Sequence, residues 1–162
     1  MHDLMKGKRG LVMGIANDHS IAWGIAKALA AQGAELAFTY QGDAQAKRLR
    51  PLVQPLGSDM ILPCDVEDVG SIDCVFEALR SKWQRLDFLV HAIGFTDKNE
   101  LRGRYADTTR ENFSRTMLIS CFSFTEIAGL RGVSDRTIQR DWRKARALLH
   151  RSILGDGKPT AS

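Results

Sequence analysis

The stretch Gly10-Leu11-Val12-Met13-Gly14 is a short apolar run that ends in glycine. The polar residues 17–19 follow it, and then a segment of helical composition, 20–32. A run of this kind before a glycine loop and a helix predicts a buried strand, a turn and a helix. We expect Ser20 to cap that helix and Gly33 to end it.

The same alternation repeats outward from this stretch. Apolar runs predict strands at 34–40, 60–65 and 86–91, and helices are expected within 43–56, at 71–83 and from Thr109 to Phe124. Pro51 and Pro55 should shorten or kink the second helix. Nearly continuous apolar strands that alternate with helices predict a parallel sheet covered on both faces. The fold class is therefore α/β, a Rossmann-type doubly wound sheet of about four strands.

In such a sheet, ligands bind beyond the carboxyl ends of the strands, where the first strand meets the first helix. Here that place is the segment 14–21. Free amides at the helix start, near Ser20 and Ile21, would attract a pyrophosphate, and Gly14 would let the backbone turn close to it. The segment has no G-x-G-x-x-G pattern, so a purely architectural loop remains an alternative.

The residues Gly14-Ile15-Ala16-Asn17-Asp18-His19-Ser20-Ile21-Ala22-Trp23-Gly24 resemble the opening of the bacterial NADH-dependent enoyl-acyl-carrier-protein reductases. These enzymes are a branch of the short-chain dehydrogenase/reductase superfamily. The likeness continues through Ala-Glu-Leu-Ala-Phe-Thr-Tyr-Gln (34–41), Leu-Gly-Ser-Asp (56–59), Pro-Cys-Asp-Val (63–66) and the segments 91–101 and 103–113, to about Ala128. The resemblance implies an oxidoreductase of fatty acid synthesis that uses NADH/NAD.

The resemblance also implies roles for individual residues, with Gly14, Ser20 and Ile21 at the pyrophosphate and the neighbouring ribose. Gln41 would lie by the adenosine ribose, where a neutral residue fits NADH better than NADPH. Asp65 and Val66 would flank the adenine, although Asp65 could instead cap its loop. Ile93 and Gly94 would line the nicotinamide side, with ordinary packing as the alternative for Ile93. Thr96 would lie near the acyl substrate.

The catalytic residues of this family form a Tyr-x6-Tyr-x6-Lys set, which stabilises the enolate oxygen, holds the cofactor ribose and supports proton delivery. The chain has two tyrosines, Tyr40 and Tyr105, and neither is followed by these partners. We therefore predict a truncated reductase that binds NADH without efficient catalysis, and we assign no catalytic residue. Whether the chain is an enzyme stays open.

The last 37 residues, 126–162, carry 8 basic and 4 acidic side chains, whereas residues 1–125 carry 15 of each. The whole net charge of +4 therefore lies in the C-terminal segment. Residues 124–146 resemble the helix-turn-helix in region four of extracytoplasmic-function sigma factors. Their candidate DNA contacts are Arg136, Thr137, Gln139, Arg140, Arg143 and Lys144. The predicted parts are thus 1–125, the helical segment 126–154 and a flexible tail 155–162.

The composition argues against a metal site and a membrane-spanning segment. The three cysteines form no CxxC pair and the four histidines have no ligand spacing, so we expect buried free thiols and no metal site. No apolar stretch reaches the roughly 18 residues of a membrane span, and the N-terminus is not a signal peptide, so cytosol is expected. The helix near 109–125 is a candidate oligomer interface. A DNA-binding regulator and a non-functional fusion reading frame remain the alternatives.

Overall fold

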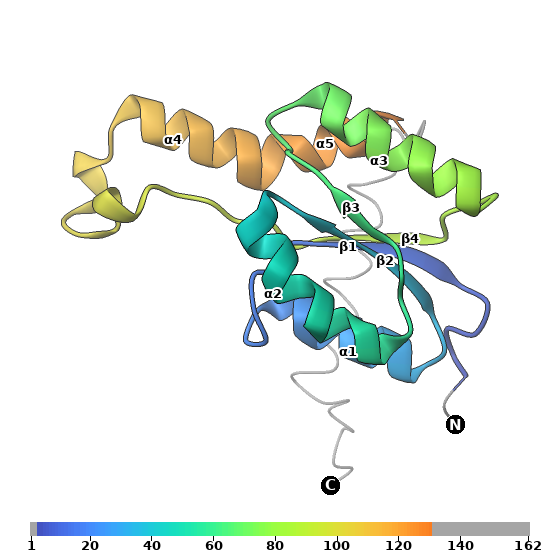
Figure 1. The fold of residues 1–162 in the computed structure, drawn as a ribbon. Coiled ribbons are helices and arrows are strands. Elements are labelled where there is room, and N and C mark those ends of the chain that lie inside the picture. The colour runs from blue at the N-terminus through green and yellow to red at the C-terminus, as the bar shows by residue number, and fades with distance from the viewer. Residues whose placement is uncertain (1–2, 131–162) are drawn as a thin grey trace, which may run out of the picture. The chain divides into compact units, whose positions relative to one another are not determined.

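The computed structural model describes residues 3–130 (Figure 1). The chain divides into two compact units, Met1–Phe124 and Thr125–Ser162. The candidate DNA contacts, and residues 131–154 of the predicted helical segment, lie outside the described residues.

A four-stranded parallel sheet forms the centre of the first unit. Its strands are β1 (Arg9–Met13), β2 (Glu35–Tyr40), β3 (Ile61–Pro63) and β4 (Phe88–His91), in the spatial order β3-β2-β1-β4. Leu11 is the register partner of both Ala37 on β2 and Leu89 on β4. The predicted parallel sheet is confirmed, and the chain order reverses beside β1, which is where such sheets place their ligands.

Helices cover both faces of this sheet (Figure 1). On one face lie α1 (Ile21–Ala31) and α2 (Asp43–Val53), and on the other lies α3 (Val69–Lys82). A loop with two short 3₁₀ turns, 98–101 and 105–107, leads from β4 to α4 (Arg110–Met117). One π-helical turn, Leu118–Phe122, then joins α4 to α5 (Ser123–Leu130).

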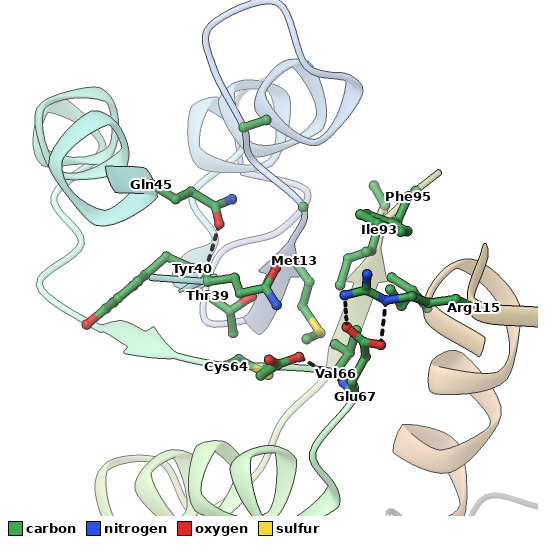
Figure 2. A pocket seen from close by; sticks show the side chains of 17 residues that line it. Met13, Thr39, Tyr40, Gln45, Cys64, Val66, Glu67, Ile93, Phe95 and Arg115 are labelled. Atoms are coloured by element: carbon green, nitrogen blue, oxygen red, sulfur yellow. Dashed lines mark hydrogen bonds and ion pairs between the residues drawn. The ribbon is translucent and has the colours of Figure 1, made fainter. Parts of the chain in front are cut away.

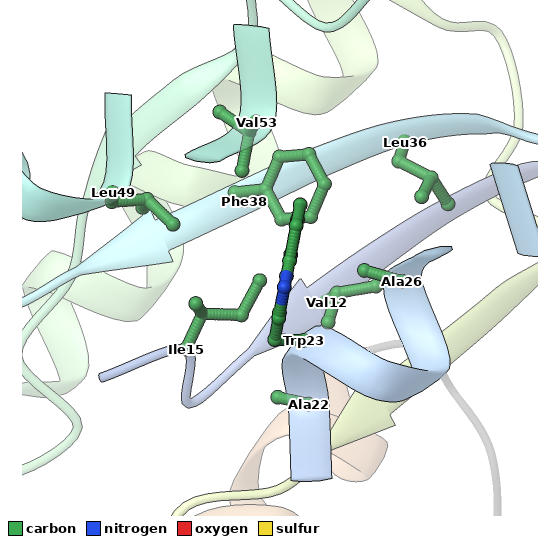
Figure 3. Close-up of a cluster of buried hydrophobic side chains, with 9 residues drawn as sticks. All are labelled: Val12, Ile15, Ala22, Trp23, Ala26, Leu36, Phe38, Leu49 and Val53. Carbon is green, nitrogen blue, oxygen red and sulfur yellow. The ribbon is translucent and has the colours of Figure 1, made fainter. Parts of the chain in front are cut away.

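The main hydrophobic core lies between the sheet and the pair α1 and α2. Phe38 of β2 is fully buried there and packs beside Trp23 of α1, with Leu49 and Val53 of α2 close to it (Figure 3). Side chains of a strand alternate between faces, so Leu11 and Met13 are buried on the side opposite Val12. Burial on both faces explains why the strands read as continuous apolar runs.

Two local predictions about side chains are wrong. Ser20 occupies the N-cap position of α1, but its hydroxyl accepts no backbone N–H of the helix and donates to the carbonyl oxygen of Asn17 at 2.6 Å. Cys64 is buried as expected, but Cys74 and Cys121 are exposed. The buried face of α3 consists of Ile72, Val75, Phe76 and Leu79, and Cys74 lies off that face.

The helical stretch 110–122 leaves much of its apolar surface uncovered by the first unit. Phe113, Met117, Leu118 and Phe122 are 38–53% exposed. This surface coincides with the candidate oligomer interface, whose role stays a prediction. Every helix within residues 3–130 falls short of the length and apolarity that a membrane crossing needs.

Candidate functional site

The carboxyl ends of the four strands surround one cavity of about 230 Å³ (Figure 2). β1 and β2 contribute their last residues, β3 and β4 are followed by lining residues, and α2 and the 110–122 helix close two sides. The lining residues are Met13, Gly14, Ala16, Thr39, Tyr40, Gln41, Gln45, Cys64, Asp65, Val66, Glu67, Ala92, Ile93, Gly94, Phe95, Arg115 and Ile119. Six of the nine predicted cofactor and substrate residues are in this set: Gly14, Gln41, Asp65, Val66, Ile93 and Gly94.

Gly14, the residue after β1, lies against the chain that leaves β4. Its φ angle is +97°, and a Cβ atom there would overlap the carbonyl oxygen of Ala92. Only glycine allows both this angle and this approach. The loop after β1 can therefore turn across the edge of the sheet and leave the cavity open.

Ser20 and Ile21 begin α1 but do not line the cavity. The backbone N–H groups of Trp23 and Gly24 donate to the Ser20 carbonyl oxygen. Within residues 3–130, the N–H groups of Ile21 and Ala22 have no hydrogen-bond acceptor. Such free amides at a helix start can receive an anion. The two predicted residues thus form a helix N-terminus, and their contact with a pyrophosphate stays a prediction.

The end of β2 is held by a glutamine from α2. The side-chain oxygen of Gln45 accepts the backbone N–H of Gln41 at 2.6 Å, and its side-chain amide donates to the carbonyl oxygen of Ile15 at 2.8 Å. Gln45 therefore connects the loop after β2 to the loop after β1. No sequence pattern indicated this connection, because Gln45 and Ile15 are 30 residues apart in the chain.

The loop after β3 carries the predicted adenine contacts. One carboxylate oxygen of Asp65 accepts the backbone N–H of Glu67 at 2.9 Å, so Asp65 does cap its loop. Its second oxygen receives no hydrogen bond from the described residues and remains available for a ligand. Val66 is buried. Burial, with a smaller effect of Asp65, raises the pKa of the neighbouring Cys64 thiol to about 11, so this lining group is a neutral thiol at pH 7.

An ion pair forms the opposite wall of the cavity. The Arg115 guanidinium donates to both carboxylate oxygens of Glu67, at 2.9 and 2.8 Å, and lies 4.7 Å from the centre of the Phe95 ring (Figure 2). Hydrogen bonding to Arg115 lowers the pKa of Glu67. The charged side chains that line the cavity are Asp65, Glu67 and Arg115, so its wall carries one net negative charge.

Thr96, the predicted substrate residue, lies outside this cavity. Its hydroxyl accepts a hydrogen bond from the side-chain amide of Asn112 at 3.1 Å. Asn112 is buried, and its oxygen accepts the backbone N–H of Asp97 at 3.0 Å. Thr96 therefore helps to anchor the 95–100 loop to α4, beside a second cavity lined by Phe95, Asp97, Glu100, Thr109, Glu111, Asn112 and Arg115.

His91, at the end of β4, belongs to a partly buried structural contact. Its Nε2 lies 2.8 Å from the hydroxyl of Ser123, and that hydroxyl donates to the carbonyl oxygen of Ile119. The ring nitrogen must then be the donor. Burial lowers the pKa of His91, which favours this neutral form. Residues 3–130 contain no cluster of His, Cys, Asp or Glu that could hold a metal ion.

Comparison with known proteins identifies the family to which this site belongs. The family model described as enoyl-(acyl carrier protein) reductase matches residues 14–132. The chain belongs to the enoyl-(acyl carrier protein) reductase family. It is 72% identical to enoyl-[acyl-carrier-protein] reductase [NADH] 2 of Rhizobium meliloti over 128 residues. The aligned region covers 79% of this chain and 48% of that protein.

Solved structures of this reductase family are also similar to the chain in fold. FabI from Candidatus Liberibacter asiaticus is 60% identical, with a TM-score of 0.77, over 79% of this chain and 50% of that one. The reductase from Anaplasma phagocytophilum, solved in complex with NAD, is 53% identical with a TM-score of 0.76, over 80% of this chain and 49% of that one. The chain thus spans about half the length of these reductases.

Proposed function

We propose that the first unit binds NADH in the cavity at the carboxyl ends of the strands. The observation that carries this proposal is that six residues, selected for a dinucleotide from sequence alone, line one cavity beside the reversal of strand order. The relatives support the choice of cofactor, since the Rhizobium protein is named as an NADH enzyme and the Anaplasma structure holds NAD.

The lining residues suit the parts of this cofactor. Gly14 and the start of α1 offer the pyrophosphate a close backbone and free amides. The free oxygen of Asp65 can accept the exocyclic amine of adenine, and Val66 can cover its ring. Nothing lies within 4 Å of the position that a Cβ atom would occupy at Gly94, which leaves room on the nicotinamide side. When bound, NADH supplies a hydride to an acceptor.

We propose further that the chain binds this cofactor without efficient reduction of an enoyl thioester. Tyr40 and Tyr105 are its only tyrosines, and neither has the second tyrosine and the lysine of the family set. Removal of one preorganised donor to an oxyanion typically costs a factor of about 10²–10³ in rate. Purified chain mixed with NADH and a short enoyl thioester should show no enzyme-dependent fall in absorbance at 340 nm.

Titration with NADH, followed by the fluorescence of the nicotinamide, tests the binding proposal. We expect a saturable change, and we expect Asp65→Asn to weaken binding by about tenfold, because the loop cap survives but the charged acceptor is lost. The matched control is Asp73→Asn, which removes the same charge from the exposed side of α3 and should leave the affinity unchanged. Absence of any saturable change up to millimolar NADH would contradict the proposal.

A second candidate function, DNA binding by residues 126–154, rests on the charge excess of the C-terminal segment. Binding of the full chain to promoter DNA, measured at several salt concentrations, tests it. We expect a preference for some sequences that persists as salt rises. If the affinity depends on salt but not on DNA sequence, the segment binds DNA only through its positive charge, and the candidate function is wrong.

A further inference from the structure

Arg115 links two loops that follow different strands of the sheet. From α4 its guanidinium reaches Glu67 in the loop after β3 and Phe95 in the loop after β4 (Figure 2). The proposed adenine contacts directly precede Glu67, and Gly94, on the proposed nicotinamide side, directly precedes Phe95. One side chain of α4 therefore contacts the loops at both ends of the proposed cofactor site.

The contact between Arg115 and Glu67 has a defined geometry. The Nε and Nη2 atoms of Arg115 donate to the two carboxylate oxygens of Glu67 at 2.9 and 2.8 Å, which fixes both distance and orientation. Because hydrogen bonding to Arg115 lowers the pKa of Glu67, the pair is ionised at neutral pH. The backbone N–H of Glu67 also donates to the Asp65 carboxylate at 2.9 Å. The ion pair therefore holds Glu67 against α4, and Asp65 is held with it.

The position of Arg115 is itself constrained. Its guanidinium lies 4.7 Å from the centre of the Phe95 ring, within the range of a cation–π contact. The backbone N–H of Phe95 donates to the Ser120 hydroxyl at 3.1 Å, which connects this residue to the 110–122 helix. Arg115 and Phe95 each line both the cavity at the strand ends and the second cavity. Together they form the wall between the two cavities.

Two other roles explain this arrangement less well. The Arg115 and Glu67 side chains are 53% and 28% exposed, and solvent screens such ion pairs so that they stabilise a fold little. Arg115 is also a weak attractor for the phosphates of a cofactor, because it is paired with Glu67 and lies near Asp65 and Asp97. The hydrogen bond and charge of Glu67, with smaller effects of these two carboxylates, raise the pKa of Arg115. The geometry therefore favours a role in fixing the loop after β3.

We propose that Arg115 is a positioning residue, which acts through Glu67 to hold the loop after β3 where the adenine of the cofactor meets it. This inference rests on the proposed function, because it requires that the cavity binds NADH. Since the two side chains act as a pair, loss of either one should weaken binding to a similar extent.

Titrations of the full chain with NADH test this role in Glu67→Gln, in Arg115→Gln and in the double variant. In Glu67→Gln an NH₂ group replaces one of the two acceptors of Arg115, so the paired hydrogen bonds are lost although the cavity wall becomes less negative. We expect the NADH affinity of each single variant to fall by about fivefold, and that of the double variant to fall no further. An electrostatic role alone predicts tighter binding in Glu67→Gln, because the cofactor is an anion.

The matched controls are Glu77→Gln and Arg110→Gln, which remove the same charges from exposed positions that do not line the cavity. Solvent screens distant exposed charges, so the NADH affinities of the controls should stay within about twofold of the wild-type value. The urea midpoint of Glu67→Gln should equal that of the wild type, whereas a merely structural role would lower it. The inference is overturned if Glu67→Gln binds NADH as tightly as the wild type or more so, if its midpoint falls together with its affinity, or if the two single effects multiply in the double variant. Failure of the wild type to bind NADH contradicts the proposed function itself.

Discussion

Gly14→Ala is expected to destabilise the protein by about 3 kcal/mol or more and to abolish dinucleotide binding. A side chain at a φ angle of +97° is strained, and the new Cβ would overlap the Ala92 carbonyl oxygen, which is backbone and cannot turn aside. Relief of that overlap requires β1 and the end of β4 to separate. Because those two segments form one wall of the cavity, stability and binding should be lost together. Urea denaturation followed by circular dichroism measures the first effect, and NADH titration the second.

Gly24→Ala is the control for Gly14→Ala. Gly24 lies inside α1, and nothing is within 4 Å of its added Cβ, so alanine should stabilise the helix by about 0.5–1 kcal/mol. The two glycine substitutions thus have opposite expected signs. If Gly14→Ala unfolds with the wild-type free energy, the close approach of β1 to the end of β4 is wrong.

Phe38→Ala is expected to lower the free energy of unfolding by about 3–5 kcal/mol. Phe38 has no exposed surface and fills the space between β2, α1 and α2 beside Trp23 (Figure 3). Truncation would leave a cavity in addition to the lost burial. Since small domains are stable by only about 5–15 kcal/mol, such a loss should shift the denaturation midpoint visibly.

Phe113→Ala is the matched control for Phe38→Ala, because Phe113 is 47% exposed on α4. Its expected cost is below about 1 kcal/mol, as for surface positions generally. Equal losses for the two phenylalanines in denaturant titrations would show that the sheet and the pair α1 and α2 do not enclose the core described here.

The strands were predictable because each is a short and nearly continuous apolar run, which is typical of a parallel sheet covered on both faces. The third strand is shorter than predicted and ends at Pro63, although the Cys64 N–H still donates to the Tyr40 carbonyl oxygen at 2.8 Å. The helix predicted from residue 71 begins at Val69, because the Asp68 side chain accepts the Gly70 N–H and caps it there. The first and last residues of an element depend on single hydrogen bonds, which apolar periodicity does not indicate.

The site was predictable at Gly14 from the end of the first strand, and at Gln41 and Asp65 from the family resemblance. It was not predictable where distant segments meet. Arg115 and Glu67 are 48 residues apart, and each alone reads as an ordinary charged surface residue. The sequence indicated the helix near 109–125 as a candidate interface, but apolar periodicity does not say whether this unit or another surface covers its apolar face.

The most direct test of the central claim is a map of amide chemical shifts in the isotope-labelled chain as NAD is added. We expect saturable changes of the amide chemical shifts near the carboxyl ends of the four strands, at Gly14, Gln41, Asp65 and Gly94. The amide shifts at the amino ends of the strands should not change. Saturable shifts confined to other surfaces, or no saturable shift at millimolar NAD, would contradict it.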